Sequence, residues 1–183
     1  MSSRGTGWRV GVAALGIWVA ACDGPGEPPV AAGAAETADQ VMYVFTHNVT
    51  VDGVWRARLR ADSAYVYQES GYVDLFGVTV EFMSPQGAIT STVTSREGRY
   101  ESRSQNMEAR GDVVAVTPDG RRLETSVLVF DRARQKISGP SEFRFCAPDR
   151  QLEGDGFTSD PEFRNVETIR PRRGRMGEVR CGA

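Results

Sequence analysis

The chain has very few of the side chains on which enzymes and metal sites depend. Among its 183 residues there are one histidine, His47, and three cysteines, with no Cys-x-x-C pair and no Cys/His cluster. His47 has no serine, cysteine or second histidine at a usable spacing, and no two acids form an evident catalytic pair. We therefore predict that the chain is not an enzyme and that it binds no metal ion or other cofactor.

The sequence also lacks a strong imbalance of charge. Lysine and arginine together number 22 and the acids 24, which gives a net charge of −2. A chain that binds nucleic acid through its phosphates usually carries a clear basic excess. We therefore expect no nucleic-acid partner.

The apolar stretch near the N-terminus is too short to span a membrane permanently. It covers residues 10–19, about half of the roughly 20 residues that a spanning helix needs. Arg4 and Arg9 precede it and small residues follow it, which is the pattern of an export signal. We interpret residues 1–21 as a signal peptide.

The end of this signal, VAAC at residues 19–22, resembles the bacterial lipobox. The resemblance implies that a diacylglycerol is attached to Cys22 and that the signal is then cut before it. Asp23 follows directly, and in this position it resembles the residue that retains lipoproteins at the inner membrane. The alternative is an ordinary signal peptide with a cysteine at this place by chance. We expect an inner-membrane lipoprotein that faces the periplasm, because two or more acyl chains hold a protein stably at a membrane.

The rest of the chain divides into a linker and a β-rich domain. Residues 22–40 are rich in proline, glycine and alanine and lack aromatic residues, which is typical of a flexible tether. From Val41 onward, short alternating segments are separated by turn sequences such as SPQG and TPDG. These hairpins recur with a period of about 30 to 35 residues, which predicts stacked antiparallel hairpins that share one long core.

The C-terminal part leaves two questions open. Cys146 and Cys181 could form a disulfide in an oxidising compartment, but the sequence gives no distance between them. Residues 169–183 form a segment with five arginines, which could contact anionic headgroups or simply be mobile. We predict a β domain over residues 41–168 and assign no role to the basic tail at 169–183.

Two runs in this domain resemble the LptC family, the periplasmic component of lipopolysaccharide export that is anchored at the inner membrane. ARGDVVAVTPDGRRLETSVLVFD, which begins at Ala109, is similar to the family's G-N-V-x-V…D-G-x-x-L-x-T-x-x-L-x-Y-D run, and LEGDGFTSDPEFRNV, from Leu152, to its G-x-G-F-x-x-D close. Asp112 and Phe130 stand where the family often has Asn and Tyr. Many family members are anchored by a transmembrane helix, whereas this chain is expected to use a lipid.

The resemblance implies an all-β fold, an open twisted β-jellyroll with an apolar groove. Lipopolysaccharide would enter this groove from the LptBFG transporter and pass on to LptA, which would add to a free sheet edge. Val78, Val80 and Phe82 alternate with polar residues and form one apolar face. The residues that we expect to line the groove are Val78, Val80, Phe82, Val114, Val116, Leu123, Val127 and Val129.

Two alternatives stay open. Leu128 has the opposite parity to Leu123, so a bulge near Ser126 would be needed to bring both inward. The whole domain could also be a β-rich lipoprotein with a closed core and a structural or interaction role, in which case its interior would be filled.

Overall fold

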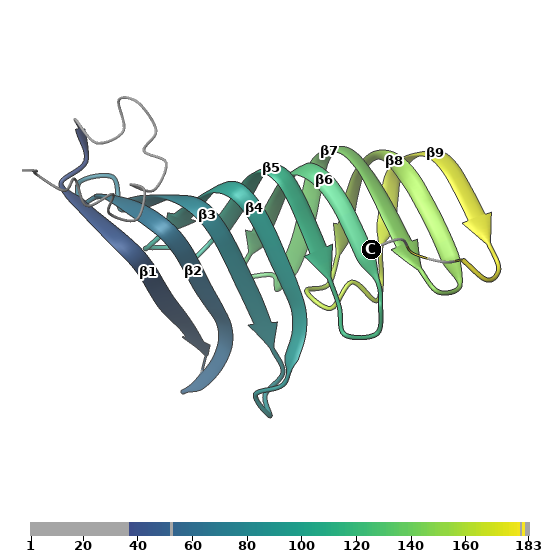
Figure 1. Cartoon of the computed structure of the whole chain (residues 1–183), viewed down its shortest axis with the longest axis horizontal. Helices are drawn as coiled ribbons and strands as arrows, with labels where there is room; N and C mark the ends of the chain where they lie inside the picture. The colour runs from purple at the N-terminus through teal and green to yellow at the C-terminus, as the bar shows by residue number, and fades with distance from the viewer. Residues whose placement is uncertain (1–36, 52, 180, 182–183) are drawn as a thin grey trace, which may run out of the picture.

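The computed structural model describes residues 37–51, 53–179 and 181 and shows nine β-strands in one sheet (Figure 1). Most of the strands are long and follow one another through short turns. They are β1 (Gln40–Val51), β2 (Val54–Tyr67), β3 (Tyr72–Met83), β4 (Ile89–Glu101), β5 (Met107–Val116), β6 (Arg122–Asp131), β7 (Lys136–Ala147), β8 (Arg150–Ser159) and β9 (Glu167–Met176).

The strands lie in the sheet in the order in which they occur in the chain. Every neighbouring pair is antiparallel, from β1–β2 to β8–β9. Within the described residues β1 and β9 each pair on one side only, so the sheet is open at both ends. The predicted all-β class and the stack of hairpins are confirmed.

The turn between β5 and β6 shows how the sequence specifies a hairpin. Gly120 donates its backbone N–H to the Thr117 carbonyl at 3.0 Å, and Thr117 donates its own to Arg121, also at 3.0 Å. The Asp119 carboxylate accepts hydrogen bonds from the Arg121 guanidinium and the Thr117 hydroxyl, and these lower its pKa to about 2. Proline and glycine set the turn angles of this segment, and Asp119 fixes its two flanks.

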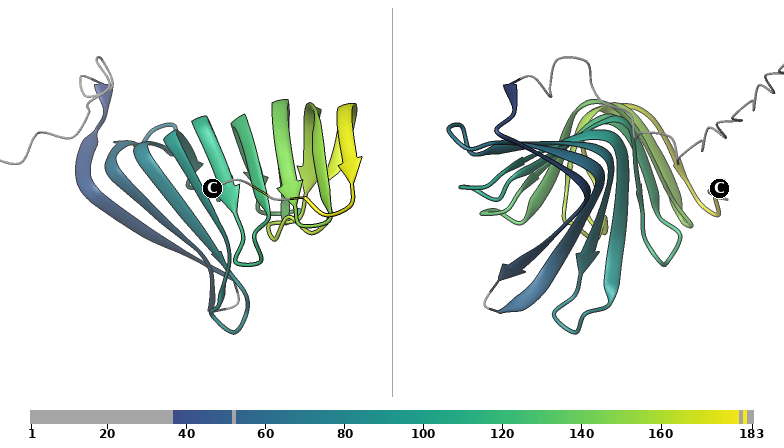
Figure 2. Two further views of the ribbon diagram at one scale, coloured as in Figure 1. Left: turned by 45° about the vertical axis from the view of Figure 1, so that its right-hand side comes forward. Right: turned by 60° about the vertical axis from the view of Figure 1, so that its left-hand side comes forward.

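The strands bend near their middle, so the sheet folds into two arms that face each other (Figure 2). The bend coincides with a line of bulges: the register shifts after Thr94, Arg110, Thr125 and Gly139 in four successive strand pairs. Gly77 and Gly111 lie on this line with φ of 65° and 71°, values that glycine adopts without strain. Gly111 thus occupies the middle of β5, at a bend of the sheet.

A single apolar core fills the space between the two arms. It extends along the sheet from Val49 on β1 to Phe157 on β8 and includes Phe163 in the β8–β9 connection. Most of its residues come from alternate positions of each strand, because successive side chains point to opposite faces of a sheet. The core is therefore a long, narrow interior that runs across the stack of hairpins.

The C-terminal boundary of the sheet differs from the expected one. The limit predicted at residue 168 falls inside β9, so most of the arginines expected in a tail belong to a paired strand. This strand has no alternation of apolar residues in its sequence, and its residues are mostly exposed. It is held by backbone pairing with β8, which a reading based on hydrophobic periodicity does not detect.

Beyond β9 the chain turns back over the sheet. Gly177 and Val179 donate their backbone N–H groups to Asp149 and Pro148 in the β7–β8 turn, at 3.0 and 2.9 Å. Cys181 forms a disulfide with Cys146 on β7, with the two Cα atoms 5.7 Å apart. The last strand is therefore tied to the strand two places before it.

Candidate functional site

The interior between the arms is the feature that the sequence predicts as functional. On β3, Val78, Val80 and Phe82 are all buried there, with 4–6% of their surface exposed. Leu123 on β6 is buried as well, with 1% exposed. These four of the expected lining residues lie on the inner face.

The other four expected residues lie on the outer face, and this corrects the prediction. On β5, Val113 and Ala115 are each 1% exposed, whereas Val116 is 38% exposed and Val114 is half-buried. On β6 the inner positions are Leu128 and Phe130, and their neighbours Val127 and Val129 pair with outward-facing residues of β5.

A bulge explains the difference on β6, but not the one on β5. On β5, the inward-facing residues on either side of the bulge are Ala109 and Val113. Both are odd-numbered, so the same set of alternate residues faces inward before and after the bulge. On β6, the inner positions change from Thr125 to Leu128, which reverses the parity at Ser126. The sequence alone did not decide whether this bulge is present. On β5, the preference for valine over alanine selected the wrong face, because the narrow interior accommodates the small Ala115.

Near its centre the interior narrows to an apolar slit. It is lined mainly by aliphatic side chains from β2 to β6, and its volume is about 20 Å³, which is room for about one water molecule. Its main lining residues are Leu59, Leu75, Val78, Val80, Phe82, Val93, Met107, Ala109, Leu128 and Phe130. The slit is narrow and apolar, so an acyl chain could enter it only if the side chains or the arms moved apart.

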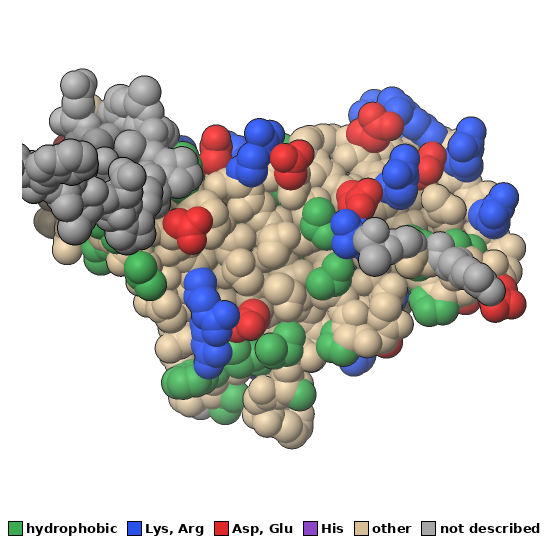
Figure 3. Space-filling model, viewed as in Figure 1, with side chains coloured by type: hydrophobic (Ala, Val, Ile, Leu, Met, Phe, Trp, Pro, Cys, Tyr) green, Lys and Arg blue, Asp and Glu red, His purple; other side chains and the backbone are tan. Residues whose placement is uncertain are grey.

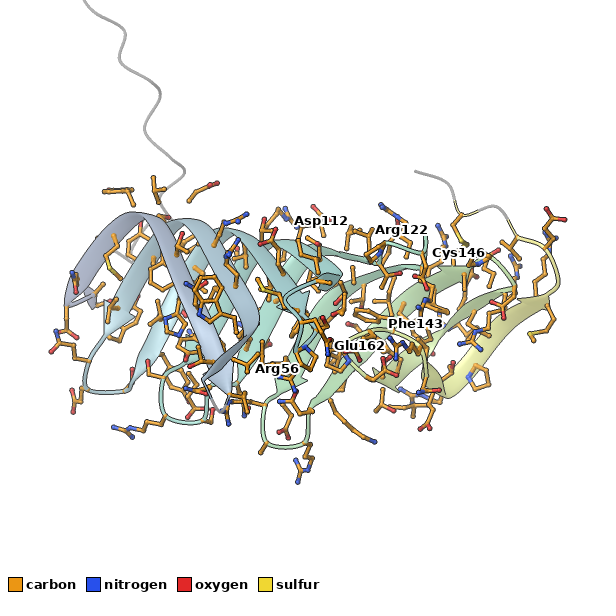
Figure 4. All side chains as sticks on the ribbon, turned by 90° about the horizontal axis from the view of Figure 1, so that it is seen from below. Arg56, Asp112, Arg122, Phe143, Cys146 and Glu162 are labelled. Atoms are coloured by element: carbon orange, nitrogen blue, oxygen red, sulfur yellow. A yellow bond between two sulfur atoms is a disulfide. The ribbon has the colours of Figure 1, made fainter. Side chains whose placement is uncertain are left out.

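A second hollow, which we call the mouth cavity, lies on the open side of the fold. Its volume is about 220 Å³. Apolar side chains line one part of it and charged or polar side chains the other. They are Val49, Val51, Arg56, Ala57, Phe82, Met83, Thr90, Phe130, Arg132, Gln135, Asp160, Pro161 and Glu162. Figure 4 labels Arg56 and Glu162, two of the charged residues that line this cavity.

The β8–β9 connection, residues 160–166, closes part of this opening. The Ser91 hydroxyl on β4 donates a hydrogen bond of 2.6 Å to the Pro161 carbonyl, and Phe163 is buried in the core. The Asp160 carboxylate accepts three hydrogen bonds from Arg164 and Asn165, each 3.0 Å long. The connection thus crosses from the C-terminal strands to β4 and fills part of the interior with an aromatic ring.

The two free edges of the sheet differ in chemistry. β1 contains no lysine, arginine or acid, and Tyr43 and Val44 are exposed on it. β9 carries Arg170, Arg172, Arg173 and Arg175 together with Pro171. Figure 3 shows basic side chains gathered at this end of the molecule. Charge and proline on an edge strand discourage indiscriminate pairing, so β9 selects its partners more strictly than β1.

His47 lies on β1 beside aromatic residues. Its ring centroid is 5.0 Å from that of Tyr100 and 6.3 Å from that of Phe45. Burial lowers the pKa of His47, so the neutral imidazole is favoured. Within the described part of the chain, no group of three or more histidines, cysteines or acids is placed to hold a metal ion.

Comparison with known proteins gives a clear result. Residues 10–173 match the family model described as lipopolysaccharide-assembly, LptC-related. The chain belongs to the LptC family. No curated protein matches it. Members of this family take part in lipopolysaccharide transport. They are periplasmic proteins associated with the inner membrane, and they act together with other Lpt components.

The family match includes both the apolar N-terminal stretch and the β domain of this LptC protein. It begins in the apolar N-terminal stretch and ends within β9. Among the described residues, no helix has the length and hydrophobicity required to cross a membrane. Cys22 and Asp23 lie outside the described residues.

Several residues of the interior were not predicted from the sequence. Phe130 follows from the bulge on β6, to which the conflict in parity pointed. Val113 and Ala115 were missed because Val114 and Val116 were preferred on β5. Phe163 carries no such signal, because it stands between polar residues in a connection. Its burial depends on the inward fold of residues 160–166.

Proposed function

We propose that this LptC protein receives lipopolysaccharide from the LptBFG transporter and passes it to LptA through the interior between its two arms. The observation that carries the proposal is the continuous apolar core, which is enclosed by two arms and runs towards two open sheet edges. Acyl chains require such an apolar path because their transfer from water is favourable in proportion to the area they bury.

The two edges support a direction for the transfer. The N-terminal tether leads into β1, so this neutral edge would face the membrane and the transporter. β9 lies at the far end of the sheet and would accept the edge of LptA by strand addition. Its arginines favour a partner with an acidic edge, because complementary charges across an interface select the right partner.

The N-terminal segment completes the proposal. Residues 1–21 would be the signal peptide, and residues 22–40 would link a diacylglycerol on Cys22 to the sheet. Asp23 would retain the lipoprotein at the inner membrane. The lipid would take the place of the transmembrane helix of other family members, and the domain would stay in the periplasm close to the source of its cargo.

Site-specific photo-crosslinking tests the proposal. Benzoylphenylalanine at Phe82 keeps an aromatic ring on the inner face, and at Ile169, which is 63% exposed on β9, it probes the free edge. We expect lipopolysaccharide adducts from position 82 and LptA adducts from position 169 in cells. Val114, on the outer face of β5, is the matched control and should give neither. The absence of a lipopolysaccharide adduct at position 82, and at Leu128 when it is probed in the same way, would contradict the transport path.

One observation favours a different function. The slit has room for only about one water molecule, as expected of a closed β core in a lipoprotein with a structural or interaction role. The same crosslinks separate the two functions, because a core that stays closed would never bring lipopolysaccharide within reach of Phe82.

A further inference from the structure

The mouth cavity combines features that an apolar conduit does not require. Its apolar part comes mainly from β1, β2 and β3, with Phe130 of β6, and its polar part includes two arginines, Arg56 and Arg132. With about 220 Å³ it is smaller than the roughly 300–1,000 Å³ of sites that enclose an entire drug-sized ligand. Its size suits the head of an amphiphile rather than the whole molecule.

Within the described residues, the guanidinium groups of Arg132 and Arg56 have no hydrogen-bond or ion-pair partner. The Arg132 Nε is buried and donates no hydrogen bond. The Thr90 hydroxyl oxygen is also buried and has no hydrogen-bond partner. Among the described residues, the Arg56 guanidinium forms neither a hydrogen bond nor an ion pair. Buried donors without acceptors are costly, so an anion that enters the cavity would supply what the protein does not.

The two acids of the cavity, Asp160 and Glu162, differ in whether their carboxylates are free to bind a ligand. The Asp160 carboxylate is occupied by its three hydrogen bonds from Arg164 and Asn165. Within the described part of the chain, the Glu162 carboxylate has no hydrogen-bond or ion-pair partner. An isolated inorganic anion would meet both attraction and repulsion here. A phosphorylated sugar fits better, since its phosphate can bind the arginines and its hydroxyl or amide groups can donate to a carboxylate.

The cavity is connected to the apolar slit by two aromatic side chains. Phe82 and Phe130 line both spaces. Their rings meet edge to face, with centroids 5.1 Å apart. An amphiphile with its head in the mouth cavity would therefore direct its acyl chains at this pair and, past it, into the slit.

We propose that the mouth cavity is a headgroup site for a phosphorylated, acylated sugar, in which Arg132 and Arg56 bind the phosphate and Glu162 accepts hydrogen bonds from the sugar. Phe82 and Phe130 separate the head from the acyl chains. This inference rests on the proposed function, because it assigns the residues that would recognise the polar part of the cargo. It adds a specific anion site to an interior that is otherwise apolar.

The test measures the affinity of the full chain for three probes. They are bisphosphorylated lipid A, the same lipid with its phosphates removed, both in mixed micelles of a neutral detergent, and soluble glucosamine 1-phosphate. Arg132→Gln should weaken binding of the bisphosphorylated lipid roughly tenfold, as expected for the loss of a charge-assisted contact, and leave the phosphate-free lipid unchanged. Arg56→Gln should act in the same direction.

The control is Arg134→Gln, which removes an exposed arginine of the β6–β7 turn that pairs with Asp131 at 2.7 Å and lies outside the cavity. It should bind all probes as the unmodified protein does. Thermal unfolding of each variant checks that it is folded. Glucosamine 1-phosphate should bind far more weakly than the lipid, and equal affinity would overturn the assignment to a lipid head.

Two results would overturn the headgroup site while leaving transport intact. In the first, the protein binds both lipids equally and Arg132→Gln changes neither affinity. In the second, Arg132→Gln weakens both lipids to the same extent, which would place its effect in the fold. If the unmodified protein bound neither lipid, the headgroup site and the proposed transport function would both fail.

Discussion

Gly77 shows how one residue holds the bend of the sheet. Its φ is 65°, and a methyl group at this position would overlap the carboxylate of Asp62 on the neighbouring strand. Gly77→Ala should therefore lower the free energy of unfolding by about 1–2 kcal/mol through backbone strain and by about 1 kcal/mol more because Asp62 must leave its rotamer. Urea denaturation of the variant measures this loss.

Gly87 in the β3–β4 turn provides the matched control. Its φ is 85°, but a methyl group there would meet no atom within 4 Å. Gly87→Ala should show the strain alone. If both variants lost the same free energy of unfolding, the close approach of Asp62 to Gly77 would contribute nothing to the effect of the substitution.

At the same scale, the sequence predicts a residue's face only where the alternation is uninterrupted. Val78, Val80 and Phe82 form such a run, and all three are buried. On β6 the run is broken at Ser126, and Val127 and Val129 lie outside. The position of this bulge depends on how three neighbouring strands pair, so the alternation of residues along one strand does not predict it.

At the scale of the element, β9 depends on its two ends. In the described part of the chain it pairs with β8 alone, and its side chains are mostly exposed, so little apolar burial holds it in place. The disulfide between Cys146 and Cys181 closes a segment of 35 residues that contains β8 and β9. Cross-linking a loop of that size stabilises the folded state by about 4 kcal/mol in the chain-entropy description.

Removing this cross-link should loosen β9 first. In Cys146→Ser/Cys181→Ser we expect faster hydrogen exchange of the backbone amides of β9 and of Gly177 and Val179, with those of β3 and β4 unchanged under native conditions. Hydrogen exchange measured by mass spectrometry gives this comparison directly. Uniformly faster exchange across the sheet would show that the disulfide stabilises the whole domain rather than its last strand.

Elements without hydrophobic alternation are also those that sequence reasoning misses. The hairpin turns with Pro118 to Gly120 and around Gly87 are evident from their residues. β9 and the connection at residues 160–166 are not, since one forms through backbone pairing and the other through a single buried ring, Phe163.

At the scale of the whole molecule, the sheet has two different ends. Eight spacings of about 4.8 Å separate β1 from β9, roughly 38 Å along the stack. We propose that residues 22–40 tether the sheet, and a flexible chain of this length would have an average extent of only about 25 Å. A lipid on Cys22 would therefore keep the β1 edge close to the membrane and leave the β9 edge pointing into the periplasm, which is the orientation that transfer from a membrane transporter to a periplasmic partner needs.

This orientation is useful only at the membrane where the cargo originates, and that gives Asp23 its predicted importance. In Asp23→Ser the proposed lipid on Cys22 would be retained and the proposed sorting signal lost, so we expect the protein to move from the inner-membrane to the outer-membrane fraction on a sucrose gradient. Crosslinks from benzoylphenylalanine at Tyr43, which is 52% exposed on β1, to the transporter should disappear with it. Glu27→Ser, which removes another acid of the same linker, should change neither result. If the Asp23→Ser protein stays at the inner membrane and keeps its Tyr43 crosslinks, then residence there is set by the β1 edge binding its partner, and Asp23 has no part in it.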